Sequence, residues 1–172
     1  MKKIIISSII LILISCHKTT KKENIEKVKT HSHIEQKIGE KIKDSIRQHF
    51  LDTINIQNSP VKIISSKLLK NAYSDHKDIQ IIFKNISKKD VKAIKFEWYC
   101  ENAFDKPASG KSFFIKGKST GESTTFLKKQ QTHSKIWEDF STDANTILSA
   151  RAYEVTFSNG TKWKLEQSIV NN

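Results

Sequence analysis

The residue with the most distinctive chemistry is Cys16, because its thiol is the only soft nucleophile near the amino terminus. Lys2 and Lys3 come first, and an apolar stretch follows from Ile4 to Ile14, interrupted only by two serines. This stretch is too short to span a bilayer, which takes roughly 20 apolar residues. It has the length of the apolar region of a secretory signal. The order of these residues therefore predicts that the chain is exported.

The run Leu13-Ile14-Ser15-Cys16 resembles the lipobox of bacterial lipoproteins. The resemblance implies thioether lipidation of Cys16, cleavage before it and acylation of the new amino terminus, and the small Ser15 fits such a cleavage. Three acyl chains exceed the two signals that stable anchoring requires. We expect residues 1–15 to be a lipoprotein signal peptide. The mature chain would then be lipid-anchored to a membrane of the bacterial cell envelope, facing the periplasm or the cell surface. An uncleaved signal anchor or a buried strand is the alternative.

The remaining reactive residues form no recognisable catalytic or metal-binding pattern. Cys100 has no partner for an intramolecular disulfide, because Cys16 is assigned to the lipid. Gly110-Lys111-Ser112 matches the end of a phosphate-binding loop, but the first glycine of that motif is replaced by Asp105. The pair His31 and His33 lacks the further ligands that a defined metal site needs. We therefore expect no catalytic residue, no metal site and no cofactor; hydrolysis of envelope material is a minor alternative.

The net charge is strongly positive. It is +12 for the whole sequence and becomes +10 when the signal segment, with Lys2 and Lys3, is removed. A basic protein can bind nucleic acid, anionic lipid or acidic polysaccharide. Because the export signal argues against nucleic acid, no nucleic-acid partner is expected. A composition rich in Lys, Ile, Asn and Ser also fits an AT-rich genome, and that bias is the simpler explanation of the charge.

Lysines cluster at the predicted turns and strand ends, where they could gather on one rim of the domain. Such a rim would bind an anionic glycan, lipopolysaccharide or anionic lipid. In the alternative interpretation the lysines are solvated turn residues, and the partners are envelope proteins. The candidate residues for the rim are Lys88, Lys89, Lys116, Lys118, Lys128 and Lys129.

Two segments precede the predicted domain. Residues 16–32 are polar and rich in lysine, so we interpret them as a lipidated flexible tether. Residues 33–51 carry apolar side chains at every fourth position, from Ile34 to Phe50, which predicts an amphipathic helix. This helix either docks its apolar stripe on the following domain, or forms a stalk, or associates with a second copy. The oligomeric state stays open.

Two tripeptides resemble the acceptor sequence for O-glycosylation in Bacteroidota-type bacteria, which is Asp, then Ser or Thr, then an aliphatic residue. They are Asp44-Ser45-Ile46 and Asp52-Thr53-Ile54. The resemblance implies Ser45 and Thr53 as modification sites. Chance occurrence is the simpler interpretation of such short patterns.

Residues 60–166 have the alternation of β-strands. Ile79, Ile81 and Phe83 alternate, and the series Ile94, Phe96, Trp98 and Cys100 follows with strict period two. The second series predicts a strand buried on one side, with Tyr99 on the exposed side. Trp137 is the other aromatic residue expected to be exposed. Residues 117–123 are expected to break a strand that begins at Phe113, and 125–127 and 133–137 to form short strands. Asn159-Gly160 predicts a two-residue hairpin.

Three runs resemble small immunoglobulin-like domains of bacterial surface and secreted proteins. Residues 81–96 end one strand in Asn-x-Ser and open the next with an aliphatic residue before an aromatic one. Residues 101–107 resemble the loop that follows, and 153–163 resemble the terminal hairpin. The resemblance covers residues 60–166 and implies an immunoglobulin-like antiparallel β-sandwich. Its motifs lie in turns and the core, so the expected function is a non-catalytic interaction or structural module.

Overall fold

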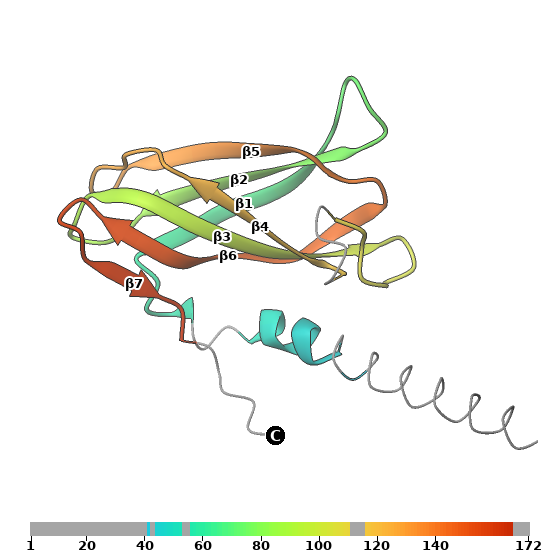
Figure 1. The fold of residues 1–172 in the computed structure, drawn as a ribbon, viewed down its shortest axis with the longest axis horizontal. Coiled ribbons are helices and arrows are strands. Elements are labelled where there is room, and N and C mark those ends of the chain that lie inside the picture. The colour runs from blue at the N-terminus through green and yellow to red at the C-terminus, as the bar shows by residue number, and fades with distance from the viewer. Residues whose placement is uncertain (1–40, 42–43, 53–55, 111–115, 167–172) are drawn as a thin grey trace, which may run out of the picture. The chain divides into compact units, whose positions relative to one another are not determined.

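A computed structural model describes residues 41, 44–52, 56–110 and 116–166. The predicted signal peptide, the predicted tether, Cys16 and the first part of the predicted helix lie outside the described residues. Within them, one short helix over 44–51 precedes a mainly β domain. Figure 1 shows this helix beside a pair of sheets whose strands run nearly along the length of the domain.

Seven strands of the described residues form two antiparallel sheets, which confirms the predicted β-sandwich. One sheet has the order β1-β2-β5 and the other β4-β3-β6-β7. In a constant-type immunoglobulin domain the fourth strand pairs with the sheet of the first two, whereas β4 here pairs with β3. The strands are β1 (Val61–Lys70), β2 (Lys77–Asn85), β3 (Val91–Asn102), β4 (Lys118–Ser123), β5 (Thr132–Ser141), β6 (Ala144–Phe157) and β7 (Lys162–Lys164).

The core lies between the two sheets and is built by the alternating side chains. Phe83 of β2 faces Phe96 of β3, with ring centres 4.7 Å apart. Trp98 packs on Trp137 of β5 at 5.2 Å. Trp137, predicted to be exposed, is therefore half-buried against the core, and that prediction was wrong. Cys100 is fully buried in the same core, as its phase on the strand predicts.

The segment expected to break a strand is itself a strand. Residues 118–123 form β4, in which Gly121 lies directly over the two tryptophans, so that a Cβ at this position would meet the Trp98 ring at 2.8 Å. The glycine serves close packing of a strand on aromatic rings and does not end the strand. The expected strand over 125–127 is reduced to a single bridge between Leu127 and Val91. Residues 113–115 lie outside the described residues.

The hairpin between β6 and β7 also differs from the prediction. The Phe157 N–H donates to the carbonyl of Thr161 at 2.9 Å, which leaves three residues in the loop. Among these, only Gly160 has a positive φ, of 82°. This is a turn closed by a left-handed glycine, the usual form of a three-residue hairpin loop. The Asn-Gly pair predicted the hairpin correctly but its loop length wrongly.

Candidate functional site

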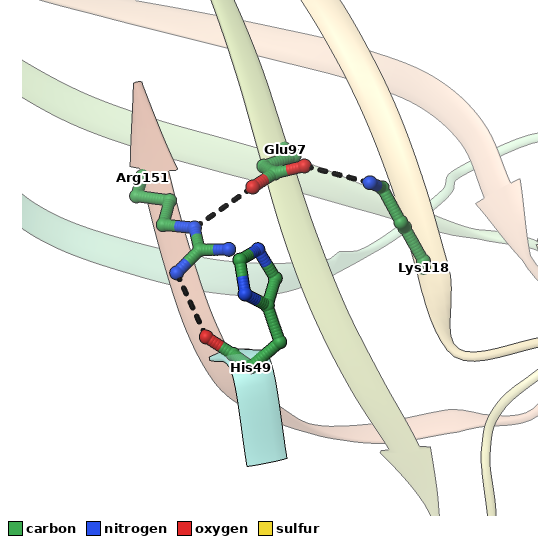
Figure 2. Close-up of polar contacts among 4 residues, drawn as sticks. All are labelled: His49, Glu97, Lys118 and Arg151. Carbon is green, nitrogen blue, oxygen red and sulfur yellow. Dashed lines mark hydrogen bonds and ion pairs between the residues drawn. The ribbon is translucent and has the colours of Figure 1, made fainter. Parts of the chain in front are cut away.

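The outer face of the four-stranded sheet carries a buried cluster of charges (Figure 2). The Oε1 atom of Glu97 accepts a hydrogen bond from Nε of Arg151 at 2.8 Å, and its Oε2 atom lies 2.8 Å from Nζ of Lys118. Nη1 of Arg151 donates to the main-chain oxygen of His49 in the helix at 3.0 Å. Arg151 is 1% exposed and Glu97 5% exposed. The cluster therefore joins three strands to the helix.

The helix covers this cluster with an aromatic side chain. Phe50 is fully buried, and its ring lies 5.5 Å from that of Tyr99 and 4.5 Å from the guanidinium of Arg151. Tyr99, expected on an exposed face, is also fully buried. The prediction was wrong because β3 is covered on both sides, by the core and by the helix. In the described part of the predicted apolar stripe, Phe50 docks on the domain.

The charges of the cluster stabilise each other. Burial alone would raise the pKa of Glu97, but the hydrogen bonds and positive charges of Lys118 and Arg151 outweigh it and hold that pKa below its usual value. The pKa of His49 is lowered, first by burial and then by the charge of Arg151. Since both carboxylate oxygens of Glu97 are engaged away from solvent, the arrangement positions the helix and offers no accessible group for proton transfer.

A second feature lies at the end of the sandwich where β2 ends and β3 begins. The side chain of Asn85, fully buried, donates from Nδ2 to the main-chain oxygens of Lys89 at 2.9 Å and Lys128 at 3.2 Å. Its Oδ1 atom accepts from the Ser87 hydroxyl at 2.8 Å. The carboxylate of Asp90 accepts the N–H of Lys129 at 3.0 Å. One buried amide and one carboxylate thus hold two lysine-bearing turns together.

We call this surface the basic end and define it by its exposed lysines, Lys88, Lys89, Lys128 and Lys129. Three more lysines border it: Lys62 and Lys84 lie opposite each other on β1 and β2, and Lys92 follows the turn. None of the seven forms an ion pair with any part of the chain that the structure describes. Like charges opposite each other in a sheet cost stability, so this surface carries unbalanced positive charge.

The structure brings together four of the six lysines proposed from the sequence and separates the other two. Lys118 is the partner of Glu97, and Lys116 lies at the opposite end of the domain, where it lines a groove with Arg47 and Glu101. The bordering lysines and Asn85 were missed. The Asn-x-Ser pattern at the end of β2 was the available signal for Asn85, but its carboxamide contacts depend on a turn more than 40 residues away.

The other candidate residues lie apart from both features. Ser45 is exposed on the helix, while Thr53, Lys111 and Ser112 lie outside the described residues, as does Cys16. No group of three metal-ligating side chains occurs among the residues whose placement is described. Nor does any helix within them have the length and apolar character needed to cross a bilayer.

Comparison with known proteins gives one structural likeness. The chain is similar to a hypothetical protein from Peptoclostridium difficile 630, known from a crystal structure, with 12% identity and a TM-score of 0.45. The match covers 63% of this chain and 87% of the other. No protein-family profile matches the chain, and no curated protein matches it.

Proposed function

We propose that this chain is a lipid-anchored, non-catalytic interaction module of the bacterial cell envelope, and that it binds an anionic partner through its basic end. The observation that carries the proposal is the pairing of two lysine-bearing turns by Asn85 and Asp90. Solvated lysines that only keep a domain soluble need no such common support. The partner would be an anionic glycan, lipopolysaccharide or the head groups of anionic lipids.

The electrostatics of the basic end support this choice of partner. Seven lysines surround one aspartate, and the carboxylate of Asp90 is already engaged with a main-chain N–H. Clustered charges raise the local concentration of oppositely charged ligands. At physiological ionic strength the attraction is screened beyond about 8 Å. Binding should therefore require contact with a closely spaced series of negative charges, such as a polymer or a membrane surface provides.

The proposal is tested by the binding preference of the mature chain. At low salt it should bind lipopolysaccharide, an acidic polysaccharide or vesicles with anionic lipid, and it should bind neutral vesicles more weakly. Equal affinity for anionic and neutral surfaces would contradict the proposal. The partner would then have to be sought among envelope proteins, by crosslinking and pull-down from native membranes.

The anchor is tested separately, through Cys16. The Cys16→Ser variant should lose lipid labelling, and it should either be released from the membrane or remain as an unprocessed precursor. The physical reason is that only the thiol can form the thioether implied by the lipobox. If the variant is processed normally and stays with the membrane fraction, the anchor assignment is wrong, whatever the basic end binds.

A further inference from the structure

The end opposite the basic end carries two aromatic side chains that project into solvent. Tyr73, in the loop between β1 and β2, is 98% exposed, and Phe104, in the loop after β3, is 82% exposed. Both loops lie at one end, because Lys77 at the start of β2 pairs with Ser141 and Asn102 at the end of β3 pairs with Ala144. In Figure 1 both loops extend from the side away from the hairpin of β6 and β7. We call this surface the aromatic end.

The two aromatic side chains are held by the same local structure. The sequences are Asn71-Ala72-Tyr73 and Asn102-Ala103-Phe104. In each, Oδ1 of the asparagine accepts the N–H of the aromatic residue, at 2.8 Å and 3.0 Å. Such asparagine turns fix the backbone of a loop tip. One exposed aromatic residue needs no explanation, but the repetition of one supporting turn under two of them indicates a prepared contact surface.

The chain enters the described domain at this same end. Arg47, near the start of the helix, forms a 2.7 Å ion pair with Glu101, which adjoins Asn102 at the base of the Phe104 loop. Asp44 and Arg47 line a groove together with Lys106 of that loop. Cys16 lies before this helix in the sequence. The segment that would carry the lipid therefore joins the domain next to the aromatic end and away from the basic end.

From these three observations we propose that Tyr73 and Phe104 insert into the interface of the membrane that holds the lipid anchor, an inference that rests on the proposed anchoring. Aromatic rings favour the region between hydrocarbon and water. The exposed lysines of this end, Lys70, Lys106 and Lys116, would meet the head groups. The lipid keeps the domain at high local concentration, so two weak aromatic contacts suffice to orient it.

This orientation determines where the basic end acts. The strand β3 has 12 residues and runs from the basic end to the aromatic end. At a rise of about 3.4 Å per residue, the two ends are roughly 35 Å apart. With the aromatic end on the membrane, the basic end would face away from it. Its partner would then be an anionic polymer of the envelope and not the head groups of the anchoring membrane.

The test measures which end touches the bilayer. The mature chain, beginning at Cys16, is coupled through that thiol to a maleimide lipid in vesicles containing acyl-brominated lipid. Cys100 will not compete, because burial raises its pKa to about 12. Phe104→Trp and the matched variant Lys129→Trp each add one exposed tryptophan. We expect several-fold stronger bromine quenching of the added fluorescence for Phe104→Trp than for Lys129→Trp.

Three outcomes would overturn the inference. Stronger quenching at position 129 would mean that the basic end faces the membrane. Equal quenching would mean that the domain has no preferred orientation, and no quenching at either position would assign the aromatic end to a glycan or protein. Because the lipid is attached chemically, the result does not depend on whether cells lipidate Cys16. A failed Cys16→Ser test and a failed quenching test are therefore distinguishable.

Discussion

At the scale of single residues, the notable choice is a carboxylate buried between two cations. Glu97 lies on the face of β3 that sequence alternation assigns to solvent, yet it is 5% exposed and contacts Arg151 and Lys118. A buried ion pair gains little over a well-packed apolar pair, but loss of one member leaves an uncompensated charge. The value of Glu97 is therefore best measured by its removal.

Glu97→Gln should destabilise the domain by about 3–5 kcal/mol, since it leaves Arg151 buried without a counter-charge. Urea unfolding measures the change. The control is Glu122→Gln, which breaks a 3.6 Å pair with Lys95 on an exposed surface and should have little effect. Similar losses in the two variants would show that the buried cluster does not hold the structure together.

Stability should also fall on mild acidification. Because the pKa of His49 is lowered by burial and by Arg151, the unfolded chain takes up a proton at a higher pH than the folded chain does. The stability is complete above the ordinary pKa of about 6.5 and is lost as the pH falls from there toward the folded pKa. The variant His49→Gln should flatten this part of the curve of unfolding free energy against pH. An unchanged slope would exclude His49 as its cause.

A further loss should begin at lower pH. The pKa of Glu97 is held below its ordinary value of 4.5, so its contribution is present above that pH and disappears as the pH falls through the folded pKa. Glu97→Gln should remove this acid transition while leaving the slope near pH 6 in place. If both slopes vanish together, the two groups titrate as one unit.

At the scale of elements, the helix over 44–51 depends on its contacts. A helix of this length is not stable alone in water. It is held by the Arg47–Glu101 ion pair, by burial of Phe50, and by Arg151, whose guanidinium meets the carbonyl of His49 near the helix end. A cation at this position also interacts favourably with the helix dipole. The sheet thus completes the helix, and the helix buries the outer face of the sheet.

Phe50→Ala should cost about 3–5 kcal/mol and release the helix, because a large buried ring is lost. Hydrogen exchange of the amides in 44–51 should accelerate more than exchange in β2, which the helix does not support. The control is Leu51→Ala at the neighbouring position, whose side chain is 42% exposed. Equal acceleration in both variants would show that helix propensity, and not docking, sets the order of this segment.

Strands with an uninterrupted alternation were predictable from the sequence, and their partners were not. The apolar series in β2 and β3 fixed their core-facing sides correctly. The second buried side of β3 depends on a helix more than 40 residues earlier, so its polar residues gave no local sign of burial. In the same way, Gly121 reads as a strand breaker until the tryptophans beneath it are known. Local pattern predicts elements, and long-range packing decides what each face meets.

At the scale of the whole molecule, the domain has two different ends. Four of the predicted lysines gather at the basic end because one asparagine joins their turns, which charge clustering alone could not reveal. The aromatic end lies at the other side, where the chain enters the domain. This arrangement supports the proposal of a module that stands on a membrane and presents positive charge away from it.

The most direct test of that proposal is the salt dependence of binding by the mature chain to lipopolysaccharide or an acidic polysaccharide. Affinity should fall steeply as salt rises, because the contact is electrostatic. Lys128→Glu with Lys129→Glu should abolish most of the binding. The charge-matched control, Lys67→Glu with Lys70→Glu on β1, should retain most of it. If both double variants lose affinity equally, binding follows net charge alone, and the basic end is not the binding surface.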